Sequence, residues 1–233
     1  MEPVDLNNLT LIDPDPNHFN ININFQTYST REFLESQDTI PNSLNLYHNN
    51  SRSLMADSGS KRDQYEAFFN KLDFPFNIII FTETWLKKDN EGHCNFDGYK
   101  SFHLLRPVDH DIDFKTKGGG ISIFVKNSID CKYRKDLERM TPHMECSFIE
   151  TKFNNQKYLI GGIYRIPDTK ICKFINELNG ILEPLRSTHK LILLGDYNID
   201  LTKSDTNKTN FELCLQTNYL VPTIFSPTRV VQK

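Results

Sequence analysis

The sequence has little excess charge, no paired cysteines and no long hydrophobic run. Its formal net charge is -3 at pH 7, whereas a protein that holds duplex DNA by bulk electrostatics is usually clearly basic. Any contact with nucleic acid must therefore be local, through a basic rim or a metal ion. The five cysteines are scattered, odd in number and never in a Cys-x-x-Cys pair. They give no zinc knuckle or disulfide framework and predict reduced thiols in an intracellular protein.

No hydrophobic run approaches the roughly 20 residues that a membrane span requires. The first ten residues carry acids and asparagines rather than a basic stretch followed by an apolar one, so they do not read as a signal peptide. We therefore expect an intracellular protein that has no membrane partner.

The length and composition suit one sizeable globular domain. The chain has 233 residues, of which 38% are hydrophobic and 24% charged, and this is enough apolar material for a core. Residues 1–42 are rich in Asn, Asp, Pro, Ser and Thr and predict a flexible leader. Within it, the alternation over Ile21–Phe25 is compatible with an edge strand. The folded domain is predicted over residues 43–233.

Within that domain, short apolar strands outnumber helices. Strands are predicted over residues 44–48, 77–81, 121–125, 146–153, 157–164 and 190–194, and helices over 62–72, 171–185 and around 211–215. Asp168 or Thr169 is placed to cap the helix that follows it. Mixed strands with few helices between them predict two sheets packed face to face with helices outside, a four-layer α/β sandwich.

Polar side chains stand where the predicted strands end. Such side chains can converge on one rim of a sheet sandwich, and the candidates are Asn49 or Asn50, Glu83, Tyr164, Asp196 and Asn198. Glu83 is either a solvated loop residue or a ligand for a hard cation such as Mg²⁺. Asp196 and Asn198 either form an Asx turn or bind one water molecule between them. Tyr164 is either a core aromatic with a satisfied hydroxyl or a site residue.

The three consecutive glycines Gly118–Gly120 precede a strand, and no Gly-Lys-Ser/Thr follows them. This context argues against a phosphate-binding loop. It predicts a tight turn that needs positive φ angles.

Six segments follow one another in the order NSRSL, FTETWL, GGGISIFVK, GGIYRIP, GDYNIDL and SPTR. Together they closely resemble the endonuclease/exonuclease/phosphatase superfamily. Within it they are most similar to the apurinic-type endonuclease domain of LINE-type (non-LTR) retrotransposons. The resemblance covers residues 43–233, and TETWL and GDYNIDL are its most specific segments.

The resemblance implies a four-layer α/β sandwich of the DNase I-like type that hydrolyses phosphodiesters in DNA with Mg²⁺ or Mn²⁺. By position, Glu83 and Asn50 match the metal-site residues, and Asp196, Asn198 and Tyr164 match the catalytic ones. In these roles Asp196 prepares the attacking water, while Asn198 and Tyr164 contact the phosphate. Thr228 resembles a phosphate-contacting position, and Arg52 and Arg165 are candidate contacts to the DNA backbone. A parent polyprotein with a downstream reverse transcriptase, and a nuclear location when active, are also implied.

The end of the chain departs from the family. Its enzymes finish with a serine-aspartate-histidine segment whose histidine contacts the phosphate, and none follows before Val230–Lys233. All seven histidines are expected on the surface or in loops. We therefore expect a fragment of a longer polyprotein, a truncated retrotransposon copy or an incomplete gene model, with one sheet edge left exposed.

Three functional hypotheses follow. The first is a DNA endonuclease that nicks target DNA for retrotransposition. The second is a phosphatase of the same fold that acts on inositol phosphates or lipids. The third is a non-catalytic or inactive remnant, which the missing histidine segment favours.

Overall fold

The computed structural model describes residues 30–35, 43–106 and 118–224. The chain divides into two compact units, residues 37–199 and a second unit of residues 1–36 with 200–233. The short helix α1 (Thr30–Glu35) falls inside the predicted leader, and the rest of residues 1–42, including the predicted strand at 21–25, lies outside the described residues. The domain boundary at residue 43 stays a prediction. Among the described residues, no helix has both the length and the apolar character of a membrane span.

The first sheet of the larger unit consists of β1 (Leu46–Asn50), β2 (Ile78–Thr82), β3 (Tyr99–Leu104) and β4 (Ile121–Lys126), in the order β1-β2-β4-β3. β1 runs parallel to β2, and the other pairs are antiparallel. Every residue of β2 is buried, as expected for a continuous apolar run in a central strand.

The second sheet consists of β5 (Cys131–Tyr133), β6 (Arg139–Met140), β7 (Met144–Phe153), β8 (Gln156–Arg165) and β9 (Lys190–Asp196). Its order is β5-β7-β8-β9, with β6 also paired to β7. The predicted hairpin joins β7 to β8 through Asn154 and Asn155, whose φ angles of 48° and 62° suit a two-residue hairpin turn. β9 runs parallel to β8, so both strands end at the same edge.

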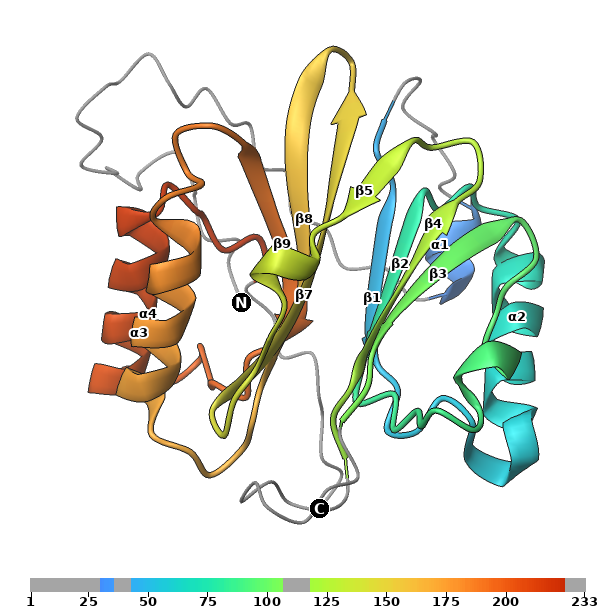
Figure 1. Ribbon diagram of the computed structural model, residues 1–233, viewed down its shortest axis with the longest axis horizontal. Helices are drawn as coiled ribbons and strands as arrows, with labels where there is room; N and C mark the ends of the chain where they lie inside the picture. The colour runs from blue at the N-terminus through green and yellow to red at the C-terminus, as the bar shows by residue number, and fades with distance from the viewer. Residues whose placement is uncertain (1–29, 36–42, 107–117, 225–233) are drawn as a thin grey trace. The chain divides into compact units, whose positions relative to one another are not determined.

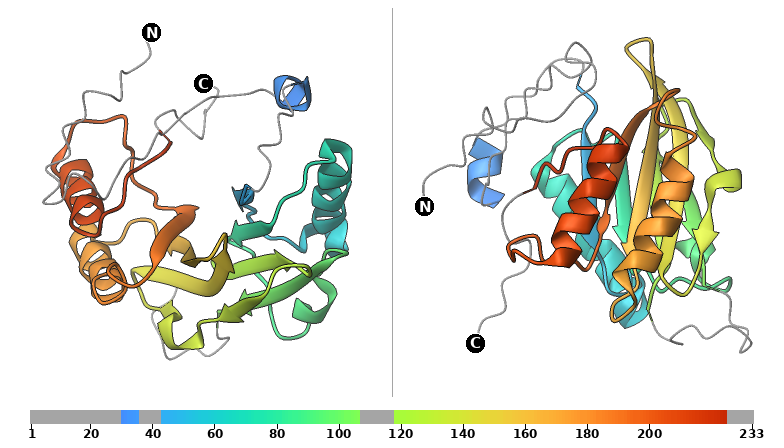
Figure 2. Two further views of the ribbon diagram at one scale, coloured as in Figure 1. Left: turned by 90° about the horizontal axis from the view of Figure 1, so that it is seen from above. Right: turned by 90° about the vertical axis from the view of Figure 1, so that its left-hand side faces the viewer.

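The two sheets pack face to face and share one hydrophobic core, which contains Ile80 and Ile121 from the first sheet and Ile160 from the second. A Cβ on Gly162 of β8 would lie 2.8 Å from Ile121 and 2.9 Å from Ile80. Glycine at this position therefore lets the sheets approach closely. α2 (Ser60–Leu72) lies outside the first sheet and α3 (Ile171–Leu182) outside the second (Figures 1 and 2). The predicted four-layer α/β sandwich is confirmed.

The second unit contains α4 (Thr206–Thr217), which corresponds to the helix predicted around residues 211–215. Its first residue is preceded by Asp205, whose carboxylate accepts a hydrogen bond of 2.9 Å from the backbone N–H of Lys208. This is the usual N-cap arrangement for an aspartate.

Two local predictions were wrong. The N-cap of α3 is Lys170, with no side-chain cap, and the hydroxyl of Thr169 instead donates to the carbonyl of Ile166 at 2.7 Å. The chain leaves Ile166 in a tight turn, with Asp168 at a φ of 63°, so neither predicted cap reaches the helix N-terminus. The helix also ends at Leu182 rather than 185.

The expectation that all histidines lie on the surface or in loops was wrong for His48 and His103. His48 lies in β1 and His103 in β3, and both are partly buried. Burial lowers the pKa of each to about 4, and at His48 the charge of Asp196 opposes this shift. Both imidazoles are therefore neutral near pH 7.

We expect His103 to make the fold sensitive to acid. Its pKa falls from 6.5 to about 4 because burial disfavours the charged form. Between these values the unfolded chain binds a proton that the folded chain does not, so the free energy of unfolding decreases as pH falls from 6.5 towards 4. The variant His103→Asn can still form a hydrogen bond with Ser122. Over the same fall in pH, its free energy of unfolding should decrease by about 1–3 kcal/mol less than that of the unmodified chain. Urea unfolding on both sides of this pH window checks this, and equal acid losses in the two proteins would contradict it.

Candidate active site

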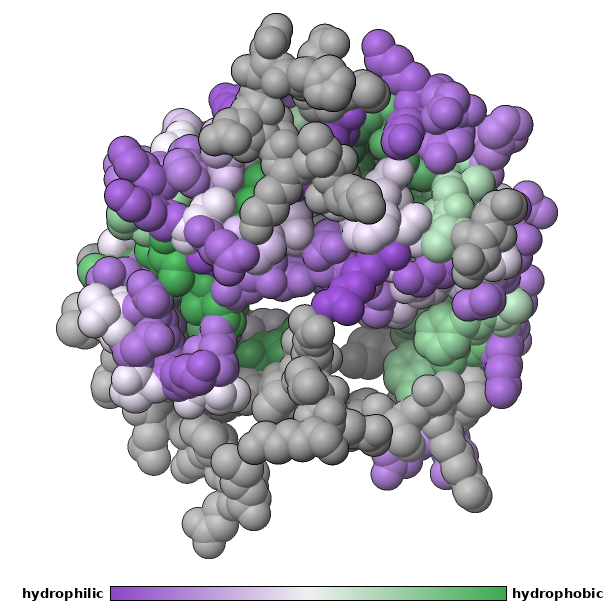
Figure 3. Space-filling model, turned by 90° about the horizontal axis from the view of Figure 1, so that it is seen from below, coloured by the Kyte–Doolittle hydropathy of each residue, from purple (hydrophilic) through white to green (hydrophobic). Residues whose placement is uncertain are grey.

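The site lies where β1, β2, β8 and β9 end. Asn50 is the last residue of β1, Glu83 directly follows β2, and Asp196 is the last residue of β9. Tyr164 of β8 pairs with Asp196 across the parallel ladder. These ends point downward in Figure 1, and Figure 3 looks onto the molecule from that side, where hydrophilic residues form a band across the face. Both sheets therefore contribute polar groups to one rim.

The amide of Asn50 joins two carboxylates from opposite sheets. Its Nδ2 donates to Glu83 Oε1 and to Asp196 Oδ2, each at 2.7 Å. Its Oδ1 accepts from the backbone N–H of Arg52 at 3.2 Å. Because one nitrogen contacts both acids, the two negative charges lie close together, and a bound cation would relieve their repulsion.

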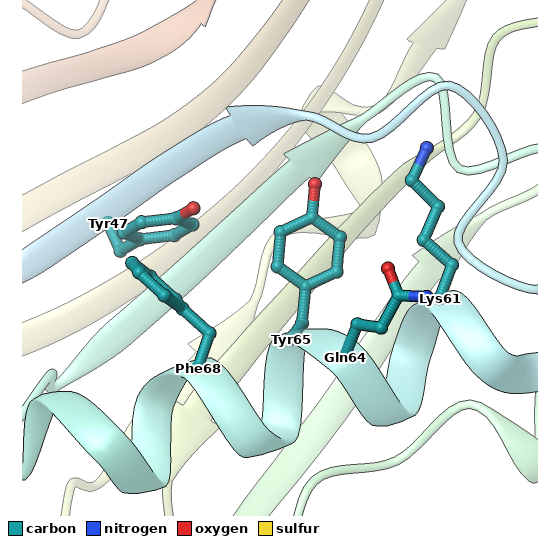
Figure 4. Close-up of a pocket in the computed structure, with 5 residues that line it drawn as sticks. All are labelled: Tyr47, Lys61, Gln64, Tyr65 and Phe68. Atoms are coloured by element: carbon teal, nitrogen blue, oxygen red, sulfur yellow. The ribbon is translucent and has the colours of Figure 1, made fainter.

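The structure also separates Asn50 from its neighbour Asn49, which the strand pattern left open and the resemblance decided for Asn50. Successive side chains of a strand point to opposite faces, and Asn49 Oδ1 accepts a hydrogen bond of 2.8 Å from the hydroxyl of Tyr65 in α2. Lys61 of the same helix donates to the carbonyl of Ser51. Tyr65 and Lys61 line a groove between α2 and β1 (Figure 4). These contacts anchor the end of β1 and so fix the position of Asn50.

Tyr164 is buried, with 4% of its surface exposed. Burial raises its pKa above the ordinary value, and the charge of Glu83 and a hydrogen bond to Glu83 raise it further. The phenol therefore stays protonated at all physiological pH values. It can act as a hydrogen-bond donor beside the carboxylate but not as a base.

Asp196 and Asn198 form the Asx turn that the sequence left as one of two possibilities. The backbone N–H of Asn198 donates to Asp196 Oδ1 at 3.0 Å, and Asn198 has a φ of 48°. The side-chain amide of Asn198 donates to the carbonyl of Arg165 at 2.8 Å. The turn holds Asp196 by one oxygen, while the other oxygen contacts Asn50.

Arg165 is 5% exposed and binds backbone atoms of the loop beside the site. Its guanidinium donates to the carbonyls of Asn198 at 3.0 Å and Thr169 at 2.8 Å. In this structure Arg165 therefore positions the Asp196–Asn198 turn, and its contact with DNA stays a prediction. Arg52 is exposed next to Asn50, whereas Thr228 lies outside the described residues.

Sequence reasoning missed a buried ion pair beside the site. Glu145 of β7 is fully buried and pairs in register with Tyr164. It forms an ion pair with Arg106 and accepts a hydrogen bond of 2.6 Å from the backbone N–H of Gly120. Burial raises the pKa of Glu145, although Arg106 opposes the shift. Glu145 lies one residue before the strand predicted over residues 146–153, so the strand pattern did not mark it.

The glycine turn has the predicted conformation. Gly118, Gly119 and Gly120 have φ angles of 99°, 75° and 84°, which glycine adopts without steric penalty. A Cβ on Gly119 would lie closer than 3.0 Å to both Arg106 and Glu145. The missing side chain therefore also makes room for the ion pair.

The residues at the rim fit a hard divalent cation. Glu83 and Asp196 supply carboxylate oxygens, the ligand type that Mg²⁺ takes, and the amide of Asn50 could contribute only its Oδ1, which accepts from Arg52. Among the described residues, no group of three or more His, Cys, Asp or Glu side chains is placed so that it could hold a metal ion. A small ligand set is compatible with Mg²⁺, which commonly binds through one or two carboxylates together with substrate phosphates.

Comparisons with known proteins identify a fold. No protein-family model matches the chain, and no curated protein matches it. The endonuclease domain of TRAS1, a telomere-specific non-LTR retrotransposon, has a similar structure, with a TM-score of 0.52 and 16% identity over 76% of this chain and 71% of that one. D. rerio TDP2, humanized by 14 mutations, gives a TM-score of 0.50 and 13% identity over 72% of this chain and 70% of that one. At these identities the likeness confirms the DNase I-like fold that the sequence motifs predict, and nothing finer.

Proposed function

We propose that this chain is a divalent-metal-dependent phosphodiesterase that nicks DNA, as the endonuclease domains of non-LTR retrotransposons do. One observation carries the proposal, namely the Asn50 amide that joins Glu83 and Asp196 from opposite sheets at 2.7 Å each. Tyr164 lies beside the same carboxylate, Glu83. Two close acids suit a site for a divalent cation, and the amide and phenol beside them could donate to a phosphate that the cation binds.

Phosphodiester hydrolysis places negative charge on the phosphoryl oxygens. Glu83 and Asn50 would hold Mg²⁺ or Mn²⁺, and the ion would supply Lewis-acid stabilisation of that charge. The hydroxyl of Tyr164 has one proton, which it shares with Glu83 here, and with Glu83 holding the metal it would donate that hydrogen bond to a phosphate oxygen instead. Both groups act where the charge develops, so their contribution is largest in the transition state.

Asp196 is the proposed base for the attacking water. Its Oδ1 is held by the backbone of Asn198 and its Oδ2 by Asn50, and a carboxylate fixed in this way can orient a water molecule and accept its proton. One amide hydrogen of Asn198 goes to Arg165, and the second is proposed to bind the phosphate.

The DNA contacts proposed for this chain are local. The net charge of -3 gives little bulk attraction for DNA, so the exposed Arg52, together with Arg165 and Thr228, is proposed to bind backbone phosphates. A parent protein with a reverse transcriptase, acting in the nucleus, belongs to the same proposal. In that parent protein, the chain would make the nick with which the insertion reaction begins.

A plasmid assay tests the proposal. Supercoiled plasmid incubated with the chain and Mg²⁺ should become nicked circles, and EDTA should slow this by at least about 100-fold because the metal supplies several kcal/mol of stabilisation. Cleavage that persists in EDTA would contradict the metal-dependent mechanism. A parallel panel of inositol phosphates separates the phosphatase hypothesis, and inactivity on every substrate would favour an inactive remnant.

A further inference from the structure

The single tryptophan of the chain lies exposed beside the candidate site. Trp85 is two residues after Glu83 and has 41% of its surface exposed, while Thr84 and Leu86 on either side are buried. An isolated exposed hydrophobic side chain is common on protein surfaces and needs no explanation by itself. At Trp85, however, the backbone and the neighbouring groups add further constraints.

The backbone at Trp85 has a strained conformation. Glu83 and Trp85 have φ angles of 52° and 55°, a region that bulky residues occupy only where the surroundings impose it. The N–H of Trp85 donates to the carbonyl of Gly119 at 2.9 Å, and the carbonyl of Thr84 accepts from Leu54 at 2.9 Å. These two hydrogen bonds hold the segment that follows β2 from two sides. The backbone positions of Glu83 and Trp85 are therefore set by the same turn.

The guanidinium of Arg106 lies beside the indole, and the Arg106 side chain is 13% exposed. A Cβ placed on Gly118 would be 3.4 Å from Trp85 Nε1 and 4.0 Å from Arg106 Nη1, so the indole edge and the guanidinium flank one glycine. Arg106 is held there by Glu145, which is fully buried. The indole edge and the guanidinium therefore lie together at Gly118, and Trp85 follows the proposed metal ligand Glu83 by two residues.

We propose that Trp85 and Arg106 form a nucleotide subsite. An unstacked base of the strand that carries the cleaved phosphate stacks on the indole, and Arg106 faces the sugar–phosphate backbone of that nucleotide. Base stacking on an exposed aromatic ring is tolerant of sequence, and Arg is the usual partner of phosphate oxygens. The inference rests on the proposed function, because it assigns the strand next to the nick to this surface.

The single tryptophan makes the subsite directly measurable, since all indole fluorescence comes from Trp85. The full chain carrying Asp196→Asn, which should not cleave, is titrated in Mg²⁺ with a thymidine decanucleotide and with an abasic strand of equal phosphate number. The thymidine strand should quench the fluorescence, and the abasic strand should leave it nearly unchanged. Binding of both strands is followed independently by the anisotropy of a label on the DNA.

Variants separate base stacking on Trp85 from a general attraction of the DNA to positive charge. Trp85→Leu should weaken binding of the thymidine strand by about tenfold or more without changing the affinity for the abasic strand, and Trp85→Phe should restore most of the loss. Lys157→Ala is the control for a lost positive charge, because Lys157 is exposed at the start of β8, at the opposite end from Tyr164. It should bind both strands as the parent does.

The outcomes for the subsite and for the nuclease are distinguishable. Base-dependent quenching in a chain that never nicks plasmid would support the subsite and reject the nuclease. Nicking by the unmodified chain, with DNA binding but no base-dependent quenching, would overturn the subsite and leave the nuclease standing. Equal quenching by both strands, or no binding in either readout, would also overturn the subsite.

Discussion

Replacing Asp196 by Asn should lower the rate of plasmid nicking by about 10²–10⁴-fold, the usual contribution of a positioned general base. The amide has nearly the same shape as the carboxylate, but it cannot accept a proton from water. It also removes one of the two negative charges next to Asn50, because Asp196 and Glu83 both contact that amide nitrogen. The effect should therefore fall on the chemical step and on metal binding, and not on the fold.

Single-turnover nicking at saturating Mg²⁺ measures the chemical step, and titration with Mg²⁺ separates it from metal affinity. Asp136→Asn is the matched control, because Asp136 is exposed and its carboxylate binds Arg134. This control should nick at the parental rate. If Asp196→Asn keeps more than about a tenth of the activity, Asp196 does not serve as the base, and another group must prepare the water.

The parts of the fold that the sequence predicted are those set by local patterns. The run Ile78–Phe81 reads as a buried strand because a continuous apolar run suits only a strand covered on both faces, and it forms β2. The three glycines before β4 predict positive φ angles because few other residues adopt them, and all three have them. In both cases the information lies in adjacent residues.

The parts that escaped prediction depend on distant partners. Among the described strands β3 pairs with β4 alone, and it is partly buried along most of its length, so its mixed sequence lacks a clear alternation. The Glu145–Arg106 pair joins residues 39 positions apart, and a buried acid is acceptable there only because that arginine is present. His103 could not be recognised as a strand residue either, because its place in β3 depends on pairing with Ser122 of β4.

The candidate site shows the same division. The sequence identified Glu83 and Asp196 from their places after apolar strands, but it could not show that Asn50 would bond both. That contact joins residues 33 and 146 positions apart and requires the two sheets to meet at the correct distance. The strand pattern by itself did not choose between Asn49 and Asn50, because that choice depends on which face of β1 packs against α2, and only the resemblance pointed to Asn50.

The distance between β8 and β9 sets the geometry of this site, and Gly195→Ala should disrupt it. Gly195 pairs with Ile163, one position before the pair of Tyr164 and Asp196. A Cβ on Gly195 would lie closer than 3.0 Å to the backbone carbonyl of Ile163. A backbone atom cannot move aside as a flexible side chain can. We therefore expect the free energy of unfolding to fall by about 3 kcal/mol or more.

Gly180→Ala provides the matched control, because a Cβ there would meet nothing within 4 Å and the residue lies inside α3. It should stabilise the fold by about 0.4–1 kcal/mol, since alanine restricts the unfolded chain more than glycine does. Urea unfolding of both variants measures the contrast. An unchanged midpoint for Gly195→Ala would show that β8 and β9 can separate without loss of stability. In that case the ladder between them would not be what holds Asp196 next to Tyr164.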